Sequence, residues 1–295
     1  MKPLNQYIKE KLIINKDYRD NTIVIKSFDE LRKIIEDRYD KLGPGTELNP
    51  IDFNDIDVSN LDSFYSRNID KGIFEGIKFK HIDISDWDVS NAESMQYMFF
   101  ECSELKSVGD ISSWDVSNVK STCNMFFGCK ELESVGDISE WDVSNVRTMR
   151  YMFAYCKELK SVGDISYWNV SKVTDMRGMF LDCKFFNQDI SKWDVSSVTY
   201  MAYMFYGCAS FNQDISSWYV TNVTDMSFMF NYCLSFNQDL SCWDVSKVTN
   251  MNAMFRGCKS FNKDISKWNV SKVKNNNILM FFNCSIEDEY KPKFK

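Results

Sequence analysis

The chain has 295 residues, 44% hydrophobic and 15% aromatic, so it can bury a large core and is not a disordered polypeptide. Its net charge is -7 with acidic and basic residues interspersed, which argues against nucleic acid as a partner because phosphate binding needs a basic surface. No run of 18 apolar residues occurs and the first 20 residues lack the apolar stretch of a signal peptide, so we expect no membrane insertion, and the localisation stays open.

The first 50 residues contain no repeat. The segment NTIVIK predicts a strand, and the run SFDE at residues 27–30 predicts a capping box before an amphipathic helix. Gly43-Pro44-Gly45 ends that helix. We interpret residues 1–50 as an amino-terminal α/β cap over the repeats, with a small independent domain as the alternative. One side of the helix is expected to carry Leu31, Ile34, Ile35 and Leu42.

Internal repetition dominates the rest of the chain. The full unit reads D-I-S-x-W-D-V-S-x-V-x-x-M-x-x-M-F-x-x-C-x-x-F-N-Q, with L-K-S-V-G replacing F-N-Q in the longer copies, and the tryptophans are spaced 27 residues three times and then 25 four times. Residues 51–81 form a degenerate first repeat, 82–286 the repeat array, and 287–295 a polar tail expected to be frayed. The eight tryptophans are Trp87, Trp114, Trp141, Trp168, Trp193, Trp218, Trp243 and Trp268.

Each repeat is predicted to combine a short strand and a short helix. The run from Val173 to Cys183 places its apolar residues within an arc of about 120° on a helix, with Ser171 as the N-cap. The DISxW segment suits a short strand followed by a bend. One repeat buries too little to offset its ordering cost, so the copies must stack. Because strands stack at about 4.8 Å and helices at about 10 Å, the array is expected to curve with its strand face concave.

The repeat carries a family resemblance. Residues 204–226 and 229–251 follow the pattern MFxxCxxF-NQDISxWDVSxVTDM, which resembles the repeat of the BspA-like leucine-rich-repeat surface proteins of bacteria. The resemblance covers residues 82 to about 284. It implies a leucine-rich-repeat type solenoid used for adhesion or recognition by usually exported proteins. With the strand and helix predicted for each repeat, the expected fold is an α/β solenoid of about eight to nine coils, with a parallel β-sheet on one face and short helices on the other.

A second, shorter resemblance concerns the amino terminus. The opening LNQYIKEKLIIN resembles the start of repeat proteins encoded by phages of gut bacteria. The cell surface, a virion and the cytoplasm are therefore alternative locations.

Cysteine and methionine are interpreted as core residues. Neighbouring helices would lie about 8 to 10 Å apart, beyond the roughly 7 Å limit between Cα atoms for a disulfide, so the column is predicted to hold free buried thiols. No C-x-x-C occurs and His81 is the single histidine, which favours core packing over metal binding and a structural histidine over a base. Cys123 and Cys242 lie off the column, which comprises Cys102, Cys129, Cys156, Cys183, Cys208, Cys233, Cys258 and Cys284.

Two polar columns leave alternatives open. Stacked aspartates would repel one another at about 5 Å unless each carboxylate accepts turn amides or the row binds hard cations such as calcium. Turn capping is the favoured interpretation. The asparagine column is expected to bond loop backbone in the same way. The columns are Asp83, Asp110, Asp137, Asp164, Asp189, Asp214, Asp239 and Asp264, and Asn187, Asn212, Asn237 and Asn262.

Candidate ligand-binding residues fall at two positions of the repeat. Immediately before the tryptophans, Glu140, Tyr167, Lys192 and Lys267 differ in size and charge, as in a recognition surface or as in unconstrained drift. Ten residues after the tryptophans, aromatic side chains form either a partner surface or packing between coils. These aromatic candidates are Tyr97, Tyr151, Tyr203 and Phe228, with Tyr206 three residues beyond Tyr203.

Catalytic motifs are missing from the sequence. With one histidine there is no nucleophile and base pair, and no phosphate-binding glycine loop occurs. The prediction is a non-enzymatic binding or adhesion module for a protein or cell-surface ligand, without cofactor or metal. A structural or accessory component of a bacteriophage particle is the alternative, and the oligomeric state stays open.

Overall fold

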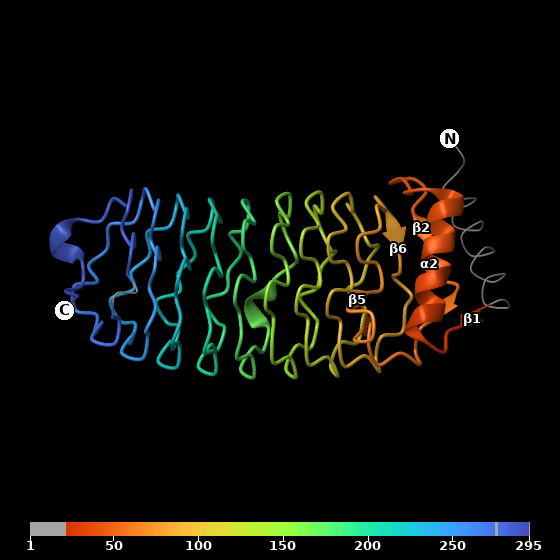
Figure 1. The fold of residues 1–295 in the computed structure, drawn as a ribbon, viewed down its shortest axis with the longest axis horizontal. Helices are drawn as coiled ribbons and strands as arrows, with labels where there is room; N and C mark the ends of the chain where they lie inside the picture. Colours follow the sequence, from red (N-terminus) through yellow and green to blue (C-terminus); the bar gives the residue numbers. More distant parts are fainter. Residues whose placement is uncertain (1–21, 275–276, 295) are drawn as a thin grey trace.

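The computed structural model describes residues 22–274 and 277–294. The chain runs as a row of coils stacked along the long axis of the molecule, and each coil corresponds to one repeat (Figure 1). The segment LNQYIKEKLIIN lies outside the described residues. The stacking expected from the repeats is therefore what the structure shows, as a repeat solenoid.

A helix covers the amino-terminal end of the row. Ser27 is the N-cap of helix α2 (Phe28–Leu42), and its Oγ accepts the Glu30 N–H at 3.2 Å. The helix lies across the end of the stack (Figure 1). It buries Leu31 and Ile35 in the common core. Leu42 is 57% exposed, so its assignment to the buried side was wrong.

Regular strands are short and lie within the first 83 residues. The predicted strand NTIVIK contains β1 (Ile23–Val24), which pairs in parallel with β3 (Ile56–Asp57). Coil-to-coil pairing then begins with β2 and β6. The remaining elements are β2 (Ile51–Asp52) parallel to β6 (Ile82–Asp83), β4 (Tyr65–Ser66) antiparallel to β5 (Lys71–Gly72), and the 3-10 helices η1 (Ile165–Tyr167) and η2 (Asp288–Tyr290).

The short helices predicted in the repeats do not form. The segment from the first methionine to the cysteine of each repeat, such as residues 95–102, is a series of turns that we call the turn ribbon. The N–H groups of Met98, Phe100 and Cys102 donate three residues back. Those of Tyr97 and Phe99 leave the coil and donate to Cys123 and Met125 of the next coil. Turns that repeat every four residues bury the same i, i+3 and i+4 positions as a helix, so the sequence periodicity could not separate the two.

The long parallel ladder also lies elsewhere than predicted. Most isolated parallel bridges join one residue per coil, seven positions after the tryptophan, at the entrance to the turn ribbon. Two further bridges, His81 to Ser107 and Ser134 to Ser161, and the β2–β6 pair lie in the predicted strand segment at the start of the longer repeats. The predicted concave strand face rested on helices spaced at about 10 Å; without them that reason for curvature disappears. The ladder runs through Ser63, Ser94, Ser121, Thr148, Asp175, Tyr200, Asp225 and Asn250.

Tryptophan bonds each coil to the preceding one. The indole N–H of Trp218 donates to the carbonyl of Ile190 at 3.0 Å, and its ring stacks on Trp193 with a centroid distance of 6.4 Å and an interplanar angle of 3°. The other seven indoles make the equivalent bond to the coil before them. The tryptophan column is therefore both apolar core and hydrogen-bond donor.

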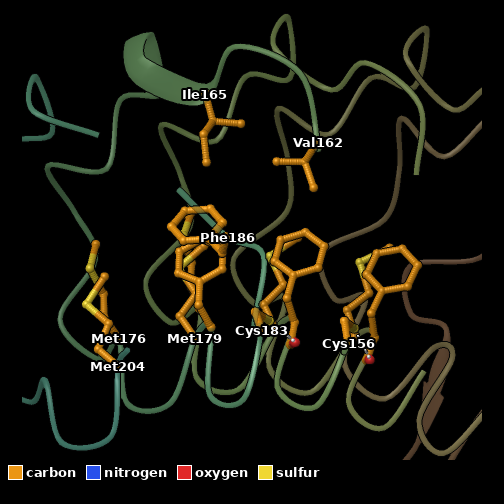
Figure 2. Close-up of a cluster of buried hydrophobic side chains, with 14 of the residues drawn as sticks. Cys156, Val162, Ile165, Met176, Met179, Cys183, Phe186 and Met204 are labelled. Carbon is orange, nitrogen blue, oxygen red and sulfur yellow. Dashed lines mark hydrogen bonds between the residues drawn. The ribbon is translucent and has the colours of Figure 1, made fainter. Parts of the chain in front are cut away.

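The cysteine column does the same on the other side of the core. The thiol of Cys183 donates to the carbonyl of Phe153 at 3.0 Å, and burial raises its pKa well above the usual value. Figure 2 shows Cys156 and Cys183 in neighbouring coils, with Ile165 across the core from them. The prediction of free buried thiols is confirmed for seven members of the column, while Cys284 is only partly buried.

Repeats of 27 and of 25 residues fill the core before the DIS segment with different side chains. Copies of 27 residues bury a leucine and a valine there, such as Leu132 and Val135, whereas copies of 25 residues bury one phenylalanine, such as Phe211. In the shorter copies the predicted asparagine ladder is confirmed: Asn187 Oδ1 accepts the Asn212 N–H at 2.9 Å, and the bond recurs in the next coils.

The aspartate column caps turns, as the favoured interpretation predicted. Asp214 Oδ1 accepts the Ser216 N–H at 3.0 Å, and hydrogen bonds from the Ser216 hydroxyl and amide lower the pKa of the carboxyl. The equivalent backbone bond recurs at the other seven aspartates. In the described part of the chain, no three His, Cys, Asp or Glu side chains are grouped to hold a metal ion.

The polar tail is folded against the last coil, contrary to the expected fraying. The Ile265 N–H donates to the carbonyl of Tyr290 in η2 at 3.0 Å. Lys291 places its Nζ 5.7 Å from the ring centroid of Phe281, and Phe294 packs against the core. The tail therefore covers part of the carboxyl-terminal end of the stack.

Replacing the Trp218 indole should measure how much its hydrogen bond to Ile190 contributes to stability. The substitution Trp218→Phe removes one of the two donors of the buried Ile190 carbonyl and leaves the Trp193 N–H, so the free energy of unfolding should fall by about 0.5 to 1.5 kcal/mol beyond the effect of lost volume. Urea unfolding followed by circular dichroism measures this. Tyr219→Phe, at a side chain 71% exposed, is the control and should change nothing. Equal stability of both variants would contradict the assigned role.

Acid should weaken the turn caps. A second set of aspartates, each directly after a tryptophan, also caps turns: Asp88, Asp115 and Asp244. Hydrogen bonds from the hydroxyl and amide of the Ser two residues later lower the pKa values of these carboxyls. A lowered folded-state pKa stabilises the fold above the ordinary value of about 3.9 and is lost as pH falls through the folded value. Asn169 and Asn269 already accept the same amide without charge. Changing all three aspartates to Asn should therefore lower the Tm at pH 7, with the difference vanishing towards about pH 2; a pH-independent difference would refute this.

Candidate recognition surface

Two residues of each turn ribbon adopt left-handed backbone conformation. In seven repeats they lie ten and fourteen positions after the tryptophan, as in Tyr151 (φ 54°) and Tyr155 (φ 62°), or Tyr203 (φ 62°) and Gly207 (φ 73°). In the last repeat, which has one extra residue, they are Leu279 and Asn283. Non-glycine residues are uncommon there because the Cβ crowds the carbonyl. The strain is offset by contacts that the side chains make along the stack, which are aromatic in several coils.

Aromatic rings join the amino-terminal coils along this surface. Tyr97 stacks on Tyr65 at 5.2 Å and meets Phe100 at the same centroid distance. Phe100 stacks on Phe127, which touches both Tyr151 and Tyr155 at 6.1 and 5.2 Å. The positions ten and fourteen after the tryptophan therefore meet the same ring.

The carboxyl-terminal coils continue the cluster. Tyr203 stacks on Phe228 at 4.7 Å with an angle of 5° and lies 6.1 Å from Tyr206. Tyr206 in turn meets Tyr232 edge-on at 6.4 Å. The five aromatic candidates predicted from the sequence are half-buried, so packing between coils, the alternative to a free surface, describes part of their role.

Small residues let the rings lie flat on the next coil. A Cβ on Gly178 would stand 2.0 Å from Cε1 of Tyr151, and one on Gly257 would stand 2.6 Å from Cδ1 of Tyr232. Glycine at these positions is required both by the left-handed backbone and by the ring above it.

Arginines lie over several of these rings. The guanidinium carbon of Arg150 is 5.0 Å from the centroid of Tyr151, and that of Arg177 is 4.8 Å from Tyr200. Arg256 lies 5.8 Å from Tyr232 and 5.5 Å from the ring of Phe282. Such contacts hold cationic and aromatic groups side by side at the surface.

Sequence reasoning missed the most exposed rings of this surface. Tyr155, Tyr200 and Tyr232 are 37%, 42% and 42% exposed. At 100° per residue, positions seven and fourteen after the tryptophan lie within about 60° of position ten on a helix, but only positions ten and thirteen were chosen as candidates. Tyrosine occurs at position fourteen in Tyr155 and Tyr232 and at position seven in Tyr200 alone, so the sequence carried little signal for these rings. We call the resulting set the aromatic face: Tyr97, Tyr151, Tyr155, Tyr200, Tyr203, Tyr206, Phe228 and Tyr232, with Arg150, Arg177 and Arg256.

Burial affects the phenols of the aromatic face. It is the main cause of the raised pKa values of Tyr97, Tyr155 and Tyr203. The three side chains stay neutral at physiological pH and keep a hydroxyl that can donate to a partner. Tyrosines of neighbouring coils contribute to these shifts. The charge of Tyr151 raises the pKa of Tyr203, and that of Tyr206 raises the pKa of Tyr155.

The other four candidates lie on the tryptophan side of the coils. Tyr167 is 72% exposed, and the Lys192 ammonium stands 3.8 Å above its ring centroid. Glu140 and Tyr167 line an open depression of about 470 Å³. Lys267 is exposed three coils beyond Lys192. The structure thus divides the nine predicted residues between two sides of the core and does not bring them together.

His81 has a backbone role in coil pairing. Its carbonyl accepts the Ile51 N–H at 3.0 Å, and it bridges to Ser107 in the next coil. Burial lowers the pKa of its imidazole, which borders an open depression of about 530 Å³. These contacts favour the structural interpretation of this residue.

The repeats match the model of one known protein family. The family DUF285, described as Mycoplasma protein of unknown function, matches residues 67–189, 125–232, 158–251 and 215–290. The chain belongs to this family. No curated protein matches it.

Two solved structures are similar in part to this member of DUF285. A leucine-rich repeat protein from Eubacterium ventriosum is 10% identical, with 74% of this chain and 76% of that chain covered and a TM-score of 0.31. A leucine-rich repeat protein from Bacteroides ovatus is 14% identical, with 70% and 65% covered and a TM-score of 0.24. Within the described residues, no helix has the length and apolar character needed to cross a bilayer.

Adding a side chain at one left-handed position and removing one at another should measure the cost of the left-handed backbone. Both positions lie fourteen residues after a tryptophan. Gly207→Ala should destabilise by about 1 to 2 kcal/mol, because φ is 73° and the new Cβ would stand 3.0 Å from Asp182 Oδ1. Glu101→Gly, at φ 56° in the same column, should stabilise by at most about 1 kcal/mol. Gly76→Ala has a similar φ with open space around it and isolates the backbone cost. Thermal unfolding decides, and a stabilising Gly207→Ala would show the assignment to be wrong.

Proposed function

We propose that the protein is a non-enzymatic recognition module that binds a protein ligand through the aromatic face. The observation that supports this most is the coexistence of exposed tyrosine rings and arginines on one continuous surface. Tyrosine and arginine are enriched at protein interfaces and among their energetic hot spots. Rings already held by stacking between coils lose little freedom on binding, which favours affinity.

The charge and geometry of the face suit a protein more than a small molecule. Arg177 is paired with Asp175 at 2.5 Å, and the other arginines cover rings, so positive charge is spread and partly neutralised. The rings form a low relief over several coils and not one deep pocket. An extended surface of mixed polar and aromatic character typically engages another macromolecule.

A finer proposal concerns the setting of this binding. The resemblance of residues 82 to about 284 to bacterial surface repeat proteins supports adhesion at a cell surface. Protease treatment of intact cells tests it: the protein should be cleaved without lysis. Sedimentation with virus particles would instead favour the accessory phage component.

Site-specific crosslinking tests the aromatic face directly. A photo-reactive phenylalanine at Tyr200 should capture a partner from an extract of the source cells, whereas one at Tyr219, on the tryptophan side and 71% exposed, should not. Replacing Tyr155, Tyr200 and Tyr232 by Ser should weaken binding of the captured protein at least about tenfold, while circular dichroism shows the fold retained.

The matched control changes Tyr167 and Tyr219, which are 72% and 71% exposed, to Ser. It should bind as the unmodified protein does. The same loss of binding in the control, or identical capture from both crosslinking positions, would refute the aromatic face as the binding surface.

A further inference from the structure

The turn ribbons give the stack a direction. Between neighbouring coils, the N–H groups that leave a ribbon always donate towards the carboxyl-terminal coil, as Phe228 does to Asn252 at 2.8 Å and Phe230 to Met254 at 3.0 Å. An ordinary β-strand edge alternates donors and acceptors. Here one end of the stacked ribbons presents carbonyl groups and the other end presents N–H groups.

A buried cation covers the carbonyl end. Arg32 of α2 is 8% exposed, and its Nη1 donates to the carbonyls of Gly72, Ile73 and Glu75 at 3.0 to 3.1 Å. A guanidinium is suited to this because it has several donors and no acceptor. The amino-terminal cap therefore supplies the complementary charge as well as apolar cover.

The N–H end has no such cover in the part of the chain that the structure describes. Phe255 and Gly257 donate to Met280 and Phe282 of the last coil at 3.0 and 2.9 Å. In that coil, among residues 277–294, the N–H groups of Leu279, Phe281 and Asn283 have no acceptor from any described residue.

Apolar side chains surround these donors. Ile278, Leu279 and Phe282 are 64%, 48% and 49% exposed, beside a fully formed core. The tail packs on Phe281 and the Ile265 backbone and leaves these three side chains exposed.

The charge of this end is opposite to that of the whole molecule. Residues 256–294 contain eight Lys and Arg and four Asp and Glu, whereas the full chain has a net charge of -7. At the edge itself, the guanidinium carbon of Arg256 lies 5.5 Å from the ring centroid of Phe282 and the Lys291 ammonium 5.7 Å from that of Phe281, so positive charge lies beside these donors and apolar side chains.

We infer that this edge of the last coil, formed by Ile278, Leu279, Phe281, Phe282 and Asn283, docks an acidic, partly apolar peptide segment of another protein. Carboxylate or carbonyl oxygens accept from the three N–H groups, and apolar side chains pack on Ile278, Leu279 and Phe282. Charge-assisted bonds from backbone N–H groups to carboxylates are among the stronger hydrogen bonds. A second copy does not fit, because its own open edge also consists of donors.

Binding of two labelled peptides tests this inference. The probe is a fluorescein-labelled peptide of glutamate, leucine and glycine, and its match carries lysine in place of glutamate. Fluorescence anisotropy should show binding of the acidic peptide alone, weakened by added salt. Amide exchange at Leu279, Phe281 and Asn283 should slow in the complex.

Two variants locate the site. The double change Ile278→Asp and Phe282→Asp should weaken the acidic peptide at least about tenfold, because it removes apolar contact and adds like charge. Leu234→Asp, at a side chain 43% exposed in the body of the stack, should bind normally.

Other outcomes would overturn the inference. They are failure of the unmodified protein to bind the acidic peptide, equal binding of the lysine peptide, slowed exchange elsewhere only, or dimers closed through this edge. Normal binding by the variant lacking Tyr155, Tyr200 and Tyr232 keeps this site distinct from the aromatic face.

Discussion

The fold depends on hydrogen bonds between successive coils. Long regular strands and helices are almost missing from the described repeats, so the backbone cannot satisfy its polar groups within one coil. Half of the turn-ribbon amides bond to the next coil, and the indoles and thiols return bonds to the coil before. Each repeat is therefore completed by its neighbours, which is why the array is stable only as an array.

This constraint explains the choice of invariant residues. Phenylalanine would fill the tryptophan position nearly as well, but only the indole of Trp218 supplies a donor from the next coil to the buried Ile190 carbonyl. Cys183 fills a small space and still donates to Phe153, which alanine cannot do. The Ile190 and Phe153 carbonyls each also accept a backbone N–H of their own coil, so the side-chain bond is the one that joins the carbonyl to the next coil. The repeated residues are core residues with one polar function each.

The core and its columns could be predicted from the sequence because each column has one strict chemical role. Trp218, Cys183, Asp214 and Asn212 were assigned to packing, turn capping or ladder bonding, and the structure places them so. The helices could not be excluded, because four-residue turns and helices bury the same spacing. That one error moved the predicted strand ladder. Tyr155 and Tyr200 were missed because tyrosine occurs at their repeat positions in only two coils and one coil, so neither position forms an aromatic column.

The two ends of the stack expose different backbone groups and therefore need different capping groups. In a helix, aligned amides leave donors at one end and acceptors at the other, and capping groups of opposite character satisfy them. The turn ribbons repeat that situation across separate coils. At the amino-terminal end, one guanidinium from a non-repeat helix meets three carbonyls. The residues that close such an array must therefore differ in chemistry from the repeat itself, since another copy of the repeat would only move the unsatisfied edge one coil further along.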